Sequence, residues 1–235
     1  MSTEKILRDH RQVVKYSTSQ WSLLEDKRKS TMELLEIFEK KQLFPYVYGS
    51  IARGNVHPNS DIDLIFLYRI PAYKIEFILN QNGYHHYRRE IIMATPNDSI
   101  KLYLYLSELK TITIPLTRLD NLSQQFYDFG GKIDIKQLRK NIRVPGIDKR
   151  LVLIKPIKEG HKEYSIINRN SIAAKEVGVS IEMIKQRERV LLRREKFGRT
   201  GVFLKRELSY SDTPEGLLKK ISNHNSIVRK KLYKK

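Results

Sequence analysis

Asp61 and Asp63 stand two positions apart, at the start of an apolar run that predicts a β-strand over residues 62–68. Side chains at positions i and i+2 of a strand face the same side, so the two carboxylates are expected to converge. Because adjacent anions repel each other, such a pair is a poor structural choice unless a divalent cation lies between them. Mg²⁺ favours one or two carboxylates together with substrate phosphates. The spacing therefore predicts a site for Mg²⁺ or Mn²⁺.

A second group of residues precedes this pair. The apolar stretch 43–48 predicts a strand that stops at Gly49, where a glycine lets the backbone turn and approach a ligand closely. Ser50 then stands where a helix would begin, so its hydroxyl and the free N–H groups form a phosphate cradle. Arg53 lies one turn further on and can meet a phosphate oxygen with its forked guanidinium. Each motif alone is usually a turn or a solvated strand edge, but their joint occurrence favours a functional site.

The segment 49–63 resembles the signature of the DNA polymerase β-like nucleotidyltransferase superfamily, in particular that of its minimal members. It contains Gly-Ser-x-x-Arg-Gly, then five residues, then Ser-Asp-x-Asp. The resemblance covers residues 20–100 and implies transfer of a nucleoside monophosphate from an NTP to an acceptor, with two metal ions and release of pyrophosphate. In this interpretation Asp61 and Asp63 hold the metal ions. The predicted nucleotide-binding residues are Gly49, Ser50, Arg53 and Ser60.

The family also uses a third carboxylate, commonly an aspartate on a neighbouring strand, as metal ligand and general base. The predicted strand 87–95 offers Glu90 at this place. Glu90 could instead pair with Arg88 or Arg89, and Asp98 in the turn that follows is the alternative acid. We expect Glu90 to complete the site, because a productive site needs a base within reach of the acceptor hydroxyl.

The elements around the motif predict the scaffold that positions it. Helical and strand-like patterns follow one another as helix, strand, strand, helix, strand, which predicts an α/β (α+β) fold with a small mixed sheet flanked by helices. The predicted helices cover 19–41, 72–82 and 119–129, and the predicted strands cover 43–48, 62–68, 87–95 and 112–116.

A boundary near residue 143 divides the chain into a predicted nucleotidyltransferase domain, 1–143, and a basic, mostly helical C-terminal domain, 144–235. The second part begins with a predicted hairpin over 150–167 that turns at Gly160. Predicted helices over 171–176 and 180–194 then resemble a helix-turn-helix, with the turn at Gly178 and a cap at Ser180. An ordinary helical hairpin with a solvated basic face fits equally well. The predicted nucleic-acid contacts are Arg187, Arg189, Arg193 and Arg194.

Composition restricts the partners. The chain carries 45 Lys and Arg against 26 Asp and Glu, a net charge of +19 that favours a polyanion, and its end, 226–235, is a basic tail. Cysteine is absent, which excludes disulfides and thiolate metal sites. No apolar run approaches the ~20 residues that span a bilayer, and the first ten residues lack a signal-peptide core. We therefore expect a cytoplasmic protein without a membrane partner.

Together these patterns predict an enzyme that transfers a nucleotide to a nucleic acid, RNA rather than DNA, with a tRNA 3′ end as one candidate. Two alternatives stay open. One is a protein AMP transferase of the antitoxin type, and the other is a catalytically inactive DNA-binding regulator. The sequence leaves open which NTP is used, how many nucleotides are added, and the oligomeric state.

Overall fold

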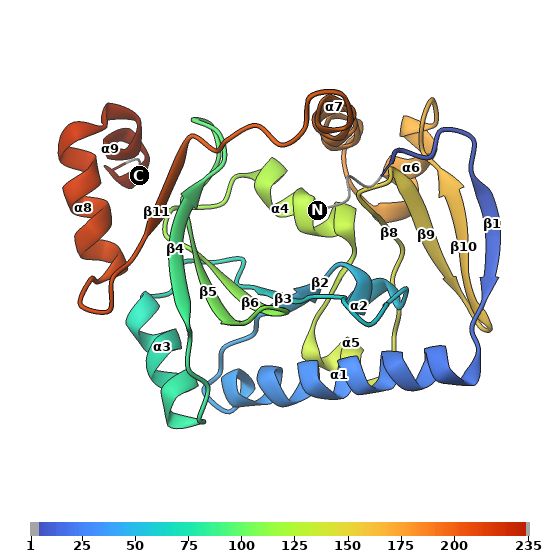
Figure 1. The fold of residues 1–235 in the computed structure, drawn as a ribbon, viewed down its shortest axis with the longest axis horizontal. Helices are drawn as coiled ribbons and strands as arrows, with labels where there is room; N and C mark the ends of the chain where they lie inside the picture. The colour runs from blue at the N-terminus through green and yellow to red at the C-terminus, as the bar shows by residue number, and fades with distance from the viewer. Residues whose placement is uncertain (1–4, 234–235) are drawn as a thin grey trace.

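Two β-sheets lie side by side in the computed structural model, which describes residues 5–233 (Figure 1). The smaller sheet is antiparallel and has the order β1 (Arg11–Lys15), β10 (Gly160–Ser165), β9 (Val152–Ile157) and β8 (Gly146–Ile147). The larger sheet has the order β11 (Leu204–Glu207), β4 (Arg88–Met93), β5 (Lys101–Ser107), β6 (Lys110–Pro115), β3 (Ile62–Ile65), β2 (Tyr46–Tyr48) and β7 (Lys132–Ile133). It is mixed, because β3 and β6 run parallel while its other described pairs are antiparallel.

Helices cover both faces of the larger sheet at its β2–β3 end. Leu64 joins the core beneath α1, whereas its neighbour Ile65 packs with Tyr127 of α4, as the period-2 alternation of a strand requires. The described helices are α1 (Thr18–Glu39), α2 (Ser50–Arg53), α3 (Ala72–Gln81), α4 (Asn121–Gly130), α5 (Ile135–Arg139), α6 (Asn170–Val177), α7 (Ile181–Phe197), α8 (Pro214–His224) and α9 (Ser226–Tyr233).

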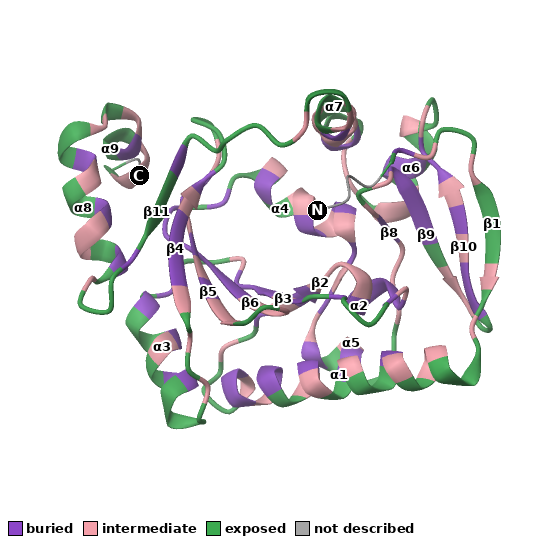
Figure 2. Cartoon of the chain, in the orientation of Figure 1, coloured by how far each residue is buried: buried purple, intermediate pink, exposed green. Residues whose placement is uncertain are grey.

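Helix α1 forms the base on which the larger sheet rests. It begins at Ser17, whose hydroxyl accepts the backbone N–H of Gln20 at 3.2 Å. One face carries Leu34, Leu35 and Phe38, which are buried towards the sheet (Figure 2). The Phe38 ring meets that of Phe66 edge to face, with centroids 5.4 Å apart. Truncating Phe38 to Ala would cost about 3–5 kcal/mol of stability, because a cavity would remain in this core.

Each sheet receives a strand from the far end of the chain. Strand β1 precedes α1 but pairs with β10 of the smaller sheet. Strand β11 follows α7 but pairs with β4, and α8 and α9 bury Leu218 and Val228 in the core of the larger sheet. The division into domains 1–143 and 144–235 stays a prediction. Strand β1 of the first part pairs with a strand of the second part, and β11 of the second part pairs with a strand of the first.

The predicted fold class is confirmed, and the elements next to the motif follow the predicted order. Within residues 5–233, eight elements were not predicted: β1, β5, β7, β8, β11, α5, α8 and α9. The predicted hairpin over 150–167 is confirmed as β9 and β10, with residues 158–159 between the strands and Gly160 as the last residue of the turn and the first of β10. A glycine is needed there because a Cβ atom would lie 2.0 Å from the carbonyl oxygen of Val14 on β1.

The ends of the chain are described in part. The predicted basic tail is helical over α9, while its last two residues, 234–235, lie outside the described residues, as do residues 1–4 of the segment considered for a signal peptide. Among the helices of residues 5–233, none has both the length and the apolar character that a membrane span requires.

Candidate active site

A cleft of about 1020 Å³ lies between the two sheets and is lined from three sides. The larger sheet contributes Tyr48, α2 and the segment up to Asp63. The smaller sheet contributes residues of β1 and β10 and the turn at Asp148–Arg150, and α4 and α7 supply the third wall. The six predicted site residues of the segment 49–63 all line this cleft: Gly49, Ser50, Arg53, Ser60, Asp61 and Asp63.

The chain turns sharply at Gly49, between β2 and α2. Its φ of +84° lies in the region that favours glycine, so a side chain here would strain the backbone. The Gly49 N–H donates to the carbonyl of Gly131 at 2.9 Å, which fixes the turn. Helix α2 buries Ile51 completely, whereas Ser50 at its first position lines the cleft. The predicted strand–turn–helix at Gly49 and Ser50 is confirmed.

Asp61 and Asp63 lie on the same wall of the cleft. Asp63 is on β3, in register with Tyr48 of β2, while Asp61 is exposed just before the strand. Desolvation, together with the negative charge of Asp61, raises the pKa of Asp63 to about 7, against a lowering effect of Lys149. The pair thus keeps a negative charge in a poorly hydrated place, which is electrostatically unfavourable without a cation.

The chemistry of these donors fits a hard divalent cation. Two carboxylates from one strand end offer oxygen ligands, and a cation bound between them would offset the desolvation and the repulsion that raise the pKa of Asp63. Within residues 5–233, however, no group of three or more His, Asp or Glu side chains forms a ligand cluster. The donor set is therefore one that holds an ion only together with oxygens of a bound substrate.

Glu90 does not join this pair. It lies on β4, and strands β5 and β6 separate β4 from β3. Its buried carboxylate accepts the Tyr105 hydroxyl at 2.9 Å and pairs with Lys205 at 3.0 Å and, more loosely, with Arg88 at 3.9 Å. Pairing with Arg88 is the alternative considered from the sequence, and it is the one that the geometry provides. Because β5 and β6 lie between β4 and β3, Glu90 is far from the two aspartates in the sheet.

Asp98 does not line the cleft either. Its carboxylate accepts the backbone N–H of Thr95 at 3.0 Å, which closes the turn after β4. Its charge still acts on the sheet face beside Asp63, where it contributes to the raised pKa of Tyr103. The role of third acid thus stays a prediction for both Glu90 and Asp98, without a contact to Asp61 or Asp63 to support it.

Arg53 and Ser60 hold in place the segment 49–63, which is named the catalytic loop after its predicted role. The buried Arg53 side chain donates to the carbonyl of Gly130 at 2.6 Å and to Oδ1 of Asn55 at 3.0 Å. The Ser60 hydroxyl accepts the N–H of His57 at 2.9 Å. Both residues position the loop through these bonds, and the phosphate contact predicted for Arg53 stays a prediction.

The predicted helix pair in the C-terminal part is confirmed as α6 and α7. Gly178 adopts a left-handed conformation at the turn, and the Ser180 hydroxyl accepts the N–H of Met183 at 3.2 Å as a cap. Arg187 and Arg194 line the cleft. Arg189 and Arg193 are exposed and do not line it. One face of α7 packs against α4 and the cleft, and only the other face is open to a nucleic acid. The helix-turn-helix role stays a prediction.

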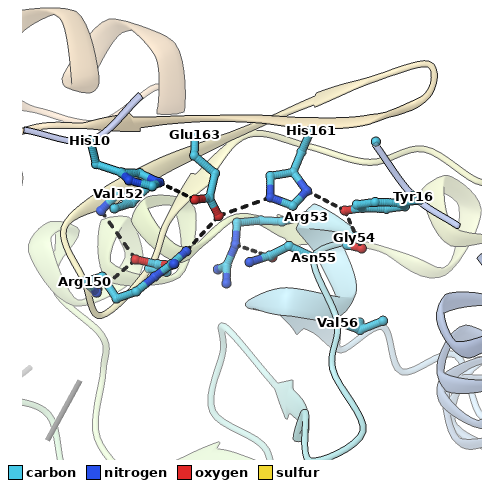
Figure 3. Close-up of polar contacts among 12 residues, drawn as sticks. His10, Tyr16, Arg53, Gly54, Asn55, Val56, Arg150, Val152, His161 and Glu163 are labelled. Carbon is cyan, nitrogen blue, oxygen red and sulfur yellow. Dashed lines mark hydrogen bonds and ion pairs between the residues drawn. The ribbon is translucent and has the colours of Figure 1, made fainter. Parts of the chain in front are cut away.

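A polar network on the smaller sheet was missed by the sequence analysis. Figure 3 shows Glu163 of β10 in contact with His10, Arg150 and His161. Burial alone would raise the pKa of Glu163, but these three hydrogen bonds outweigh it and hold the pKa well below its ordinary value. The Tyr16 hydroxyl lies 2.7 Å from Nδ1 of His161 and donates to the carbonyl of Gly54 at 2.8 Å. No local sequence pattern could predict this network, because its residues come from segments far apart in the chain.

Comparison with known proteins gives one match. A family model described as a nucleotidyltransferase domain matches residues 31–193, which include the whole motif and most of α7. The match confirms the resemblance found from residues 49–63. No curated protein and no solved structure matches the chain.

Proposed function

Since this chain belongs to the nucleotidyltransferase domain family, we propose that it moves a nucleoside monophosphate from an NTP to a nucleic-acid acceptor. In this reaction an acceptor oxygen forms a bond to the α-phosphorus, the bond between the α-phosphorus and its bridging oxygen breaks, and pyrophosphate and a proton are released. The observation that carries the proposal is the convergence of Gly49, Ser50, Asp61 and Asp63 in one cleft.

Each of these residues has a role that its position supports. Gly49 and Ser50 turn backbone and hydroxyl towards the cleft and bind phosphate oxygens. Asp61 and Asp63 hold Mg²⁺ or Mn²⁺ together with the phosphates. When bound, such an ion neutralises charge on the phosphates during transfer. The described residues add no third carboxylate to the pair. The second ion therefore rests only on what the family implies, and it remains part of the proposal.

A sheet face beside Asp63 supports a nucleic-acid acceptor. Asp63, Thr111, Tyr105 and Arg88 stand in register on β3, β6, β5 and β4. The Arg88 guanidinium lies 4.3 Å from the centroid of the Tyr105 ring. Stacked aromatic and guanidinium groups are what an unpaired base packs against, and such bases are typical of RNA ends. With the net charge of +19, this face favours RNA as the acceptor.

The test is transfer of label from each of the four α-labelled NTPs with Mg²⁺ or Mn²⁺. Total RNA, single-stranded DNA and cell protein serve as acceptors, and the Asp61→Ala/Asp63→Ala double variant is the control. We expect label in RNA with the parent protein and none with the variant. Label in protein alone would instead favour AMP transfer to a protein. No label with any acceptor, together with tight and salt-sensitive DNA binding, would favour an inactive regulator.

A further inference from the structure

The four arginines of α7 fall on two faces. Positions 187 and 194 are seven residues apart, which is almost two full turns of an α-helix, so their side chains share one face. Arg187, Leu191 and Arg194 line the cleft that also contains Asp61. Arg189 lies on the opposite, exposed side. The helix therefore directs Arg187 into the cleft and Arg194 to its exposed edge, while Arg189 and Arg193 point into solvent.

Arg187 is held in place by aromatic rings. Its guanidinium carbon lies 4.9 Å from the centroid of Phe126 and 5.9 Å from that of Phe129, both on α4. These cation–π contacts fix the direction of the side chain. They do not replace hydrogen bonds: Nε of Arg187 is buried and has no hydrogen-bond partner.

A cation in this position is energetically unfavourable when the cleft holds no anion. Desolvation, together with the positive charge of Arg194, lowers the pKa of Arg187 to about 10, against a smaller raising effect of Asp98. A buried cation without a partner normally costs stability. Such a group is retained where a ligand of opposite charge completes it.

Two other arginines of the cleft are already engaged by the protein. Arg150 pairs with Asp148 and Glu163, and Arg53 donates to Gly130 and Asn55. Arg187 differs from both, because within residues 5–233 its guanidinium makes no hydrogen bond or ion pair with a protein oxygen. The guanidinium of Arg194, which also lines the cleft, makes no hydrogen bond or ion pair within the described residues either, so these two arginines have donors for an incoming anion.

We propose that Arg187, with Arg194 at the edge of the cleft, binds the polyphosphate of the nucleotide. This inference rests on the proposed function and adds to it. The inner face of α7 recognises the phosphates of the NTP, and only its outer face, with Arg189 and Arg193, is left for a nucleic acid. Nucleotide binding consequently fixes α7 against α4 and the catalytic loop.

The experiment compares Arg187→Met, Arg187→Lys and the matched control Arg189→Met. Binding of tripolyphosphate and of ATP, each with Mg²⁺, is measured by calorimetry, and thermal unfolding is followed with and without tripolyphosphate. We expect Arg187→Met to weaken binding of both ligands about tenfold to hundredfold, the loss typical of a charge-assisted hydrogen-bonding group. Arg187→Lys should lie in between, because it keeps the charge but loses the fork. Arg189→Met should bind tripolyphosphate like the parent.

Thermal unfolding separates this role from a structural one. Without ligand, Arg187→Met should melt at the same temperature as the parent or higher, since an apolar side chain replaces an uncompensated cation of similar length. A lower melting temperature without ligand, combined with parent-like affinity for tripolyphosphate, would assign Arg187 to the core and overturn the inference. So would a loss confined to RNA binding.

The outcome also distinguishes this inference from the proposed function. If the parent protein binds tripolyphosphate through Arg187 but transfers no nucleotide to any acceptor, the site stands and the proposed reaction fails. If the parent transfers nucleotides and Arg187→Met binds ATP and tripolyphosphate with unchanged affinity, the reaction stands and the inference fails.

Discussion

Two acids on facing walls of one cleft have opposite electrostatic surroundings. Glu163 on the smaller sheet is contacted by His10, Arg150 and His161, which hold its pKa well below the ordinary value. Asp63 on the larger sheet is desolvated and lies near another acid, Asp61, and both effects raise its pKa to about 7. The charge of Glu163 is compensated by groups of the protein, whereas in the proposed function the charge of Asp63 is compensated by a bound cation.

The same contrast separates the basic residues. Arg150 donates to Asp148 and Glu163, whereas Arg187 projects over two phenylalanine rings without a hydrogen bond at Nε. Satisfied charges thus gather on the smaller sheet, and unsatisfied charges gather where the family places its nucleotide and metal ions. Such perturbed groups are typical of functional sites. In the proposed function, the smaller sheet forms one wall of the cleft, while the larger sheet and α7 contact the substrate.

The largest expected effect is on catalysis. Asp61→Ala or Asp63→Ala should lower nucleotide transfer by about a thousandfold or more, because the ion supplies several kcal/mol of charge stabilisation and each 1.4 kcal/mol is a factor of ten. Initial rates with saturating NTP measure the loss, and circular dichroism checks that the fold is retained. Retained activity in the double variant would place the metal site elsewhere.

A second prediction tests the satisfied acid. Glu163→Gln should lower the free energy of unfolding by about 3 kcal/mol at pH 7, because it leaves Arg150 and two histidines around a neutral group. Since the folded pKa of Glu163 lies below its ordinary value of 4.5, its contribution is present above pH 4.5 and is lost as the pH falls below it.

Urea denaturation between pH 3 and pH 8 provides the measurement for Glu163→Gln. The difference from the parent should shrink towards acid pH. Glu159→Gln, an exposed glutamate in the turn of the same hairpin, should change stability little at any pH. A constant difference across the whole range would show that Glu163 contributes by packing rather than by charge.

The third prediction concerns the unsatisfied acid and has the opposite sign. Because the folded pKa of Asp63 lies above its ordinary value of 3.8, ionisation costs stability as the pH rises towards about 7. Asp63→Asn removes this cost and should stabilise the metal-free protein by about 2 kcal/mol at pH 8, and by little at pH 4. Melting temperatures in the presence of a chelator test this. A lower melting temperature at pH 8 would contradict the contrast between the two acids.

The smallest expected effect lies where the two regions meet. Tyr16→Phe removes the hydroxyl that links Gly54 of the catalytic loop to His161 of the smaller sheet. We expect a loss of about 1 kcal/mol in the free energy of unfolding, as for one hydrogen bond. If the smaller sheet positions the loop, the KM for the NTP should also rise while kcat changes little. An unchanged KM would limit Tyr16 to stability.

The sequence by itself determined the catalytic loop. The turn at Gly49, the start of α2 at Ser50 and the i, i+2 placement of Asp61 and Asp63 depend on local rules of backbone geometry. Neighbouring residues carry all the information that such a segment needs. For the same reason the Gly178 turn and the Ser180 cap of the C-terminal helix pair were predictable.

The tertiary structure alone decided which distant residues share the cleft. Glu90 was expected beside the aspartates, but the insertion of β5 into the sheet order separates them, and short amphipathic strands leave their pairing open in the sequence. The pairing of β1 with β10 and of β11 with β4 was likewise open in the sequence, because each pair joins segments far apart in the chain. In α7 the spacing of the arginines shows that Arg187 and Arg194 share a face, yet only the packing of Phe126 and Phe129 directs that face into the cleft. Helical periodicity fixes relative directions along one element, whereas burial against other elements selects which direction points inward.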